Sequence, residues 1–167
     1  MSRETALIVE VPEAQVLYEA WVDSWAAPPG VPAHVTLLYP FLPRADDELV
    51  AELRSLFASV PAFEFGLARI ERFPDGTAWL APEPPEPFVA LTSTIVERFP
   101  AYPPYGGAHD EIVPHLTIAQ GEGELLARVE AGLAGLEPID ARAAEVALLE
   151  RGEDGVWCRR GTFRLGT

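Results

Sequence analysis

Lysine is absent from this sequence of 167 residues, and cysteine and methionine occur only once each. The single cysteine, Cys158, excludes a disulfide within the chain and fits a reducing compartment such as the cytoplasm. We expect its side chain to pack in a strand as a small apolar group. No run of about 18 apolar residues could span a membrane, and the first residues lack the pattern of a signal peptide.

Acidic residues outnumber basic ones. The chain has twelve arginines and 26 acidic residues, which gives a net charge of −14 at neutral pH. Binding to long nucleic acid depends on cations that neutralise phosphates, so that function is not expected. The composition favours a small nucleotide, or one RNA end that is bound at a local site. Arg159 and Arg160 could supply charge to a phosphate, but we interpret them as a surface pair.

The length fits one domain, or two lobes that share an interface, and can supply a core without cross-links. We interpret residues 1–167 as one bilobal domain and expect a monomer. The proline-rich stretch 82–87 is interpreted as the division between the lobes. The first lobe then covers about residues 1–81 and the second about residues 88–167, with elements allowed to cross between them.

Apolar periodicity predicts a mixture of strands and helices. The expected strands are residues 5–11, 33–41, 63–73, 77–81, 112–119, 139–150 and 156–165. The expected helices are residues 13–25, 46–60, 88–99 and 122–136. Hairpins mixed with helices favour an α+β fold with mainly antiparallel sheets. Apart from one N-terminal strand, the order of elements repeats in the two halves.

One short pattern occurs twice. Residues 34–37 read His-Val-Thr-Leu and residues 115–118 read His-Leu-Thr-Ile, each within an apolar run that is typical of a strand. The chain has only three histidines, so a repeat of this spacing with matched apolar neighbours is rarely due to chance. Because the two copies lie at equivalent points of the two halves, we predict that they meet in one cleft.

Strand geometry places the histidine and the threonine of each copy on one face. Alternate residues of a strand point to the same face, so His34 projects with Thr36 and His115 projects with Thr117. Each strand then offers an imidazole and a hydroxyl about 6.5–7 Å apart, which is two strand rises. Four such groups could surround a phosphate. Histidine suits proton transfer because both of its protonation states are accessible near neutral pH.

The segments 34–41 (HVTLLYPF) and 114–119 (PHLTIA) resemble the paired His-x-Thr (HxT) motifs of the two-histidine (2H) phosphoesterase superfamily. The branch that they resemble most is the one called 2′-5′ RNA ligase or RNA 2′,3′-cyclic phosphodiesterase. The resemblance covers nearly the whole chain in the order of its elements. Its specificity lies in the two motifs.

This resemblance implies a bilobal α+β fold with pseudo-twofold symmetry, a cleft between the lobes and no metal cofactor. It implies that His34 and His115 are the acid–base pair and that Thr36 and Thr117 bind phosphate oxygens. Members of the superfamily open 2′,3′-cyclic phosphates, and some join or cleave 2′-5′ RNA linkages. A small nucleotide or RNA end is therefore the expected substrate.

Gln120 departs from the pattern of the family, whose members often carry arginine at this position. Glutamine still forms hydrogen bonds but lacks the fixed charge and bidentate geometry that suit a phosphate. Two alternatives to the phosphodiesterase therefore stay open. One is a nucleotide- or RNA-end-binding protein of the same fold with little turnover, and the other is a 2′-5′ RNA ligase.

Two further interpretations concern metals and aromatic residues. Two histidines could bind Zn²⁺ with His109 or Asp110, but we expect no metal, because a histidine in a loop is usually solvated. The aromatic residues that could stack on a base, or belong to the core, are Tyr39, Phe41, Trp79 and Tyr105. Of these, Tyr39 has the wrong strand parity to share the face of His34.

Overall fold

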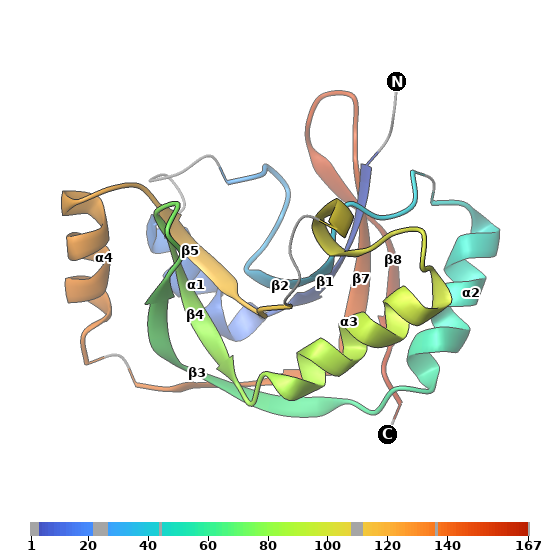
Figure 1. Ribbon diagram of the computed structural model, residues 1–167, viewed down its shortest axis with the longest axis horizontal. Coiled ribbons are helices and arrows are strands. Elements are labelled where there is room, and N and C mark those ends of the chain that lie inside the picture. Colours follow the sequence, from blue (N-terminus) through green and yellow to red (C-terminus); the bar gives the residue numbers. More distant parts are fainter. Residues whose placement is uncertain (1–3, 22–26, 44, 108–111, 136, 167) are drawn as a thin grey trace.

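The computed structural model describes residues 4–21, 27–43, 45–107, 112–135 and 137–166. This part of the chain forms two four-stranded antiparallel sheets with helices packed against them, as Figure 1 shows. The predicted α+β class is therefore confirmed. The prediction of mainly antiparallel pairing is confirmed as well, since every pair of neighbouring strands in the two sheets is antiparallel.

Each sheet takes two strands from each half of the chain. The first sheet has the order β2 (His34–Leu38), β1 (Glu4–Glu10), β7 (Glu145–Arg151) and β8 (Trp157–Arg164). The second sheet has the order β5 (Leu116–Gln120), β4 (Thr77–Glu83), β3 (Phe63–Arg72) and β6 (Ile139–Ala143). The predicted lobe boundaries near residues 81 and 88 therefore do not coincide with the two sheets.

Two details of the predicted element order are wrong. The stretch 82–87 is not a linker, because β4 continues to Glu83 and helix α3 begins at Glu86. The predicted strand 139–150 is two strands, β6 and β7, which lie in different sheets and are separated by Ala144. The repeat consequently begins with β4, whose counterpart is β1. Each of these strands is followed by a helix, a motif strand and a second helix.

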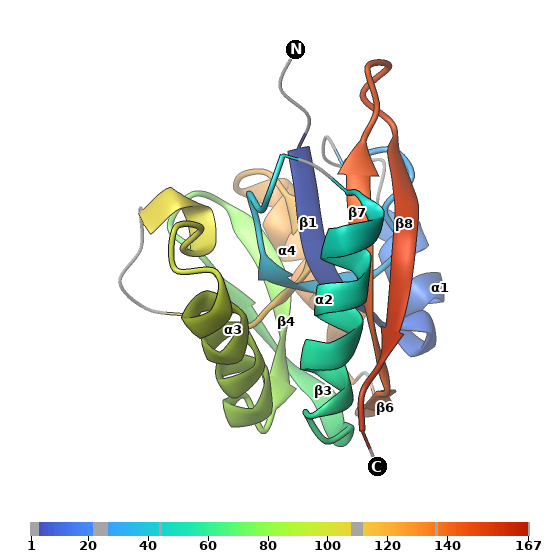
Figure 2. The same cartoon turned by 90° about the vertical axis from the view of Figure 1, so that its right-hand side faces the viewer.

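Four α-helices are present in the described part of the chain. They are α1 (Gln15–Trp21, after the short 3-10 helix Pro12–Ala14), α2 (Asp47–Ala58), α3 (Glu86–Arg98) and α4 (Glu124–Leu133), and a further 3-10 turn covers Pro104–Gly107. Helix α2 lies over the face of the first sheet (Figure 2) and packs against β8. Its Phe57 ring lies 5.7 Å from the Phe163 ring in the core. The carboxylate of Asp46 caps its first turn by accepting a hydrogen bond of 2.9 Å from the backbone of Leu49.

Two helices connect one sheet to the other. Helix α1 follows a strand of the first sheet and contacts β5 of the second. Helix α3 follows a strand of the second sheet and contacts β2 of the first, while its Phe88 packs against Phe63 and Phe65 with ring centroids 4.9 Å apart in both pairs. The two sheets consequently share one core, and the two motif strands are fixed by helices that belong to the opposite copy of the repeat.

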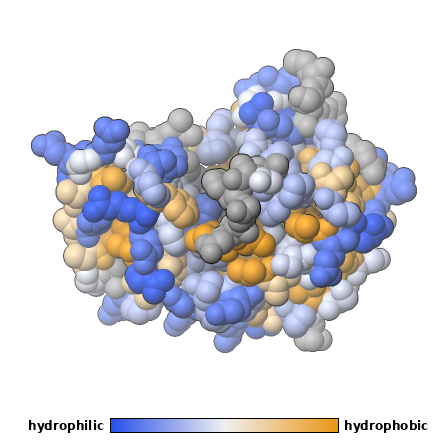
Figure 3. All heavy atoms as spheres, viewed as in Figure 1, coloured by the Kyte–Doolittle hydropathy of each residue, from blue (hydrophilic) through white to orange (hydrophobic). Residues whose placement is uncertain are grey.

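The surface is mixed in character. Hydrophilic and apolar side chains alternate in patches over the face in Figure 3, and the outline of the molecule dips at the top. None of the helices in the described ranges has the length and apolar character that a membrane crossing requires. Cys158 lies in a strand as predicted, but its side chain is exposed instead of packed, as are those of the next two residues of β8.

Candidate active site

Each His-x-Thr motif lies at the edge of a sheet. Strand β2 is the edge of the first sheet and β5 is the edge of the second. Both are shorter than predicted, because β2 covers only His34–Leu38 and β5 begins at Leu116, directly after His115. The two strands contact each other where the sheets meet. The structure thus brings together two motifs that lie about half a chain length apart in the sequence.

The predicted alternation within each motif is confirmed. In both copies the histidine and the threonine are partly exposed, and the residues that follow each of them are buried. An imidazole and a hydroxyl consequently share one face of each strand. The apolar partners that anchor the two motifs in the core are Val35, Leu37, Leu116 and Ile118.

A β-bulge follows the threonine in both copies. Leu37 has no counterpart on β1, because its neighbours Thr36 and Leu38 pair with consecutive residues of that strand. Ile118 is the extra residue of β5 in the same way. The freed carbonyl of Leu37 accepts a hydrogen bond of 2.9 Å from the hydroxyl of Thr92 on α3. Both copies of the motif therefore share an irregularity of the backbone as well as a sequence.

The bulge changes which side chains face the site. Beyond the extra residue the alternation shifts by one position, so the fifth residue after each histidine joins the face of the histidine and the threonine. These residues are Tyr39 and Gln120. The expectation that Tyr39 points away from His34 is wrong, because it assumed uninterrupted alternation. Tyr39 instead lines the same cavity as His34 and Thr36.

Both histidine rings are oriented by the same kind of hydrogen bond. Nδ1 of His34 lies 2.7 Å from the carbonyl oxygen of Pro32, and Nδ1 of His115 lies 2.8 Å from that of Val113. A carbonyl oxygen can only accept, so each Nδ1 carries the hydrogen and donates it. Nε2 is therefore the nitrogen at which each imidazole gains or loses a proton.

The surroundings lower the pKa of both histidines. Burial is the main cause, because it disfavours the charged imidazole, and the hydrogen bond to the backbone partly opposes it. The positive charge of His115 lowers the pKa of His34 further, which means that the two rings lie within electrostatic range of each other. The carboxylate of Asp75 acts in the opposite direction on His115 and raises its pKa.

Asp75 is a residue of the site that the sequence did not reveal, since Pro74-Asp75-Gly76 reads only as a turn. The hydroxyl of Thr77 hydrogen bonds to the Asp75 carboxylate and lowers the pKa of that acid, and the backbone nitrogen of Thr77 donates to Oδ1 at 2.9 Å. Nε2 of Gln120 donates to the Thr77 hydroxyl at 3.1 Å. Gln120 is thereby linked, through Thr77, to the acid that stabilises charged His115.

Replacing Asp75 with asparagine should lower the pKa of His115. The substitution removes the negative charge that favours the imidazolium and retains a side chain of the same shape. A pH titration of the imidazole resonances by NMR would measure the change, and Asp140→Asn on β6 provides a control of equal charge. An unchanged titration of His115 in Asp75→Asn would show that the two groups do not interact.

Aromatic rings pack around His115 on the second sheet. The ring of Phe73 lies 5.0 Å from the imidazole and that of Trp79 lies 5.8 Å from it, both edge-on, and the two aromatic rings stack on each other at 4.8 Å. Phe41 belongs to the core, whereas the side chain of Tyr105 lies outside the described residues. Of the aromatic candidates whose side chains are described, Trp79 and Tyr39 therefore adjoin the motifs.

A cavity of about 360 Å³ opens on the first sheet beside His34. Of the four motif residues, only His34 and Thr36 line it. The remaining walls come from β1, β7, β8, the turn between β7 and β8, and the segments that flank β2: Ala6, Ile8, Pro28, Pro29, Val31, Tyr39, Leu149, Arg151, Gly155 and Trp157. A further cavity, of about 500 Å³, is lined by Phe73 and Asp75 on the side of His115.

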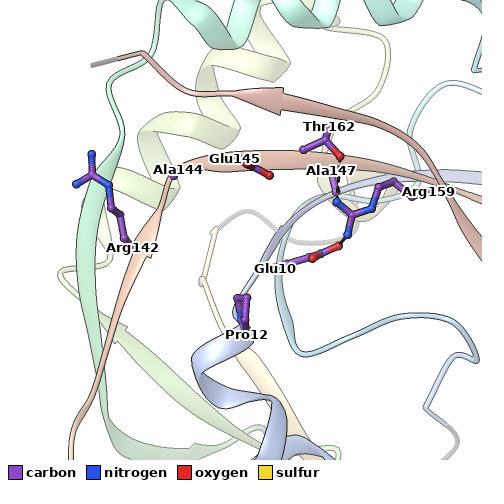
Figure 4. A pocket seen from close by; sticks show the side chains of 8 residues that line it. All are labelled: Glu10, Pro12, Arg142, Ala144, Glu145, Ala147, Arg159 and Thr162. Carbon is purple, nitrogen blue, oxygen red and sulfur yellow. Dashed lines mark hydrogen bonds and ion pairs between the residues drawn. The ribbon is translucent and has the colours of Figure 1, made fainter.

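A second cavity, of about 240 Å³, adjoins the same face of the first sheet (Figure 4). Arg159 forms an ion pair there with Glu10, and its guanidinium donates to the hydroxyl of Thr162 at 3.0 Å. The neighbouring Arg160 pairs with Glu150 at 3.0 Å. Both arginines of this sequence pair are thus bound to carboxylates of the protein itself.

Acidic side chains and potential metal ligands are scattered over the described ranges of the chain. No group of three or more His, Cys, Asp or Glu side chains that could bind a metal ion comes together there. The candidate ligands His109 and Asp110 lie outside those ranges.

Comparisons with known proteins agree with this architecture. Residues 12–155 match the family model of the 2′-5′ RNA ligase superfamily. The E. coli LigT structure in its apo form is similar, with a TM-score of 0.67, 16% identity and 100% of both chains covered. E. coli LigT complexed with 3′-AMP has a TM-score of 0.65 and 15% identity, with 100% of both chains covered. TT0787 of Thermus thermophilus has a TM-score of 0.61 and 21% identity, with 97% of both chains covered. A search of curated proteins found no match.

Proposed function

Because the chain belongs to the 2′-5′ RNA ligase superfamily, we propose that it is a metal-independent phosphoesterase that opens 2′,3′-cyclic phosphates of nucleotides or RNA ends. The observation that supports this proposal best is the duplicated site. Two imidazoles, each oriented by the carbonyl two residues before it, lie at the beginnings of two strands that contact each other. Each imidazole has a threonine beside it on the same strand face.

The reaction needs a base and an acid on opposite sides of phosphorus. The base removes a proton from water as the water oxygen bonds to phosphorus, and the acid donates a proton to the ribose oxygen that leaves. His34 and His115 can perform these tasks through Nε2, because Nδ1 of each is occupied by its backbone bond. Two histidines thereby supply both proton transfers, so that a metal-bound hydroxide is not needed.

The two threonines complete the proposed site. The hydroxyls of Thr36 and Thr117 are hydrogen-bond donors on the faces of the two histidines. In this proposal they donate to the non-bridging phosphate oxygens, whose negative charge must be stabilised during the displacement. One donor comes from each sheet, so the phosphate is bound between the two motif strands.

The proposed substrate is small. A net charge of −14 disfavours long nucleic acid, whereas a nucleotide or a single RNA end needs only a local site. E. coli LigT, whose structure is similar, has been crystallised with 3′-AMP, ATP and NADP+. We propose a monomeric protein of the cytoplasm, in keeping with its one cysteine.

Hydrolysis of nucleoside 2′,3′-cyclic phosphates in the presence of EDTA tests this function. The profile of kcat/KM against pH should be bell-shaped, because one histidine must be neutral and the other charged. The pKa of both histidines is lowered from 6.5, so the maximum should lie below pH 6.5. Loss of activity on chelation would contradict the metal-independent mechanism, and a maximum well above pH 7 would contradict the assignment of both histidines.

A binding protein with little turnover is the second candidate, and Gln120 is the residue that favours it. The family often has arginine here, but this chain has an uncharged amide that is hydrogen bonded to Thr77. Binding of 3′-AMP without turnover of any cyclic phosphate would support this candidate. Formation of a 2′-5′ linkage between two RNA ends would instead identify a ligase.

A further inference from the structure

The end of strand β5 is bound to the turn that contains Asp75. The backbone nitrogen of Gly121 donates a hydrogen bond of 3.1 Å to the carbonyl oxygen of Gly76, whose φ is +95°. A Cβ atom at Gly76 would lie 2.2 Å from the carbonyl oxygen of Gly121, so only glycine permits this close approach. The backbone therefore fixes this turn, and Asp75 with it, against the strand that follows the second motif histidine.

The same turn packs against His115. Its first residue is Phe73, whose ring lies 5.0 Å from the imidazole and whose carbonyl oxygen accepts a hydrogen bond of 3.0 Å from the backbone of Gly76. Phe73 and Asp75 line one cavity of about 500 Å³. The carboxylate of Asp75 consequently lies on the side of His115, although 40 positions separate the two residues in the sequence.

The β-bulge of β5 brings Gln120 to the face of His115. Because Ile118 is the extra residue, Gln120 stands directly opposite Thr77 in the strand register. Side chains of opposite residues lie on one face, with Cβ atoms about 4.5–5.5 Å apart. Nε2 of Gln120 reaches the hydroxyl of Thr77 at 3.1 Å. Without the extra residue, Ala119 would lie opposite Thr77, and its methyl group could not form this hydrogen bond.

The hydrogen bonds from Gln120 to Asp75 run in one direction. A hydroxyl has a single hydrogen to donate. Since the amide of Gln120 donates to the oxygen of the Thr77 hydroxyl, the hydrogen of that hydroxyl is left for the carboxylate of Asp75. The backbone nitrogen of Thr77 donates to Oδ1 of the same carboxylate at 2.9 Å. Thr77 is buried, so a side chain that water scarcely reaches links the two exposed ends.

These contacts give Gln120 a role apart from binding a phosphate. We propose that Gln120 is a positioning residue, which acts through Thr77 to hold Asp75 on the side of His115. The inference rests on the proposed function and makes His115 the acid of that reaction, because the nearby carboxylate stabilises its charged form. An exposed carboxylate that moves freely in water acts only weakly on a neighbouring charge. One that accepts two hydrogen bonds from Thr77 keeps its place.

The charges around His115 allow the effect of Asp75 to be measured. Burial lowers the pKa of this imidazole most, whereas the Asp75 carboxylate raises it. The other titratable group in electrostatic contact with it is His34, on the facing strand. Arg72 and Glu122 also line the cavity, and the guanidinium of Arg72 is paired at 2.6 Å with a carboxylate of α4. A change in the position of Asp75 should therefore change the pKa of His115.

Substitutions of Thr77 and Gln120 test the proposal by NMR titration. Thr77→Val removes the hydroxyl and retains the shape of the side chain, so the pKa of Asp75 should rise and that of His115 should fall. Thr77→Ser, which retains the hydroxyl, should restore both values. Gln120→Met removes the amide at an exposed position, where folding is not at risk, and should shift both pKa values in the same directions. Thr94→Val on α3 is the control, because its hydroxyl donates only to its own helix.

The pH dependence of hydrolysis provides a second measurement. We compare kcat/KM one pH unit above the wild-type maximum with kcat/KM one pH unit below it. This ratio should fall about two- to threefold in Thr77→Val, because less of the acid, His115, is charged on the alkaline side. It should not change in Thr94→Val. A rate that falls by the same factor at every pH would indicate a purely structural role for Thr77 and overturn the inference.

The two measurements separate this inference from the proposed function. If wild-type protein hydrolyses no 2′,3′-cyclic phosphate, the proposed function fails, and the titration of His115 alone decides the inference. A lower pKa of His115 in both Thr77→Val and Gln120→Met would support the positioning role. A pKa of His115 that is unchanged in both variants would reject it.

Discussion

Replacing either His34 or His115 with alanine is expected to slow the opening of a 2′,3′-cyclic phosphate by about 10²–10⁴-fold, which is the usual contribution of a positioned acid or base to the rate. Each ring is proposed to perform one of two proton transfers, and no other imidazole within the described ranges stands beside the pair. The measurement is the initial rate at saturating substrate, together with a thermal melt to show that each variant is folded. His109→Ala is the matched control, because it removes the third histidine of the chain.

The two histidine variants should differ in one respect. The carboxylate of Asp75 favours charged His115, and this charge lowers the pKa of His34, so we expect His115 to be the acid and His34 to be the base. A phosphodiester with a 4-nitrophenolate leaving group does not need an acid. His115→Ala should then recover much of its activity on such a substrate, while His34→Ala should not. Near wild-type rates in either variant on the natural reaction would contradict the two-histidine mechanism.

Replacing Thr36 or Thr117 with valine should lower kcat by about 10²–10³-fold, which is the effect of removing one donor to a developing negative charge. Valine retains the shape and the strand preference of threonine, so the fold should be preserved. Because the hydroxyl is needed most in the transition state, kcat should fall more than KM rises.

Thr94→Val on α3 is a suitable control for the two threonine variants. Its hydroxyl only donates to the backbone of its own helix, at Ala90, and the residue lies outside both motifs. The rate of this variant should equal that of wild type. A pair of motif variants that keep full kcat and show only a higher KM would assign the threonines to ground-state binding alone.

The sequence sufficed to predict the fold class and the arrangement within each motif, because both depend on local periodicity. A strand with a buried residue at every second position determines that His34 and Thr36 share a face, and the same holds for His115 and Thr117. Their roles as acid, base and phosphate ligands remain predictions that the variants above will test.

Features that depend on pairing between distant strands could not be predicted. The bulge at Leu37 is a property of the pairing of β2 with β1, and it alone places Tyr39 at the cavity. Asp75 is 40 positions before His115, and nothing in the turn that contains it indicates that the two side chains interact. The break at Ala144 could not be predicted, because residues 139–151 contain no glycine or proline that would mark the end of a strand.

The exchange of strands between the two halves also has a consequence for biosynthesis. Strand β1 has β2 on one side and β7 on the other, so the first sheet is incomplete until residues 145–151 have been made. Trp157, which lines the cavity beside His34, follows later still. During synthesis from the N-terminus, His34 therefore emerges early from the ribosome, but the cavity beside it can form only after Trp157 has been made. A nascent chain that stops at the proline-rich stretch 82–87 would contain one complete His-x-Thr motif and neither complete sheet.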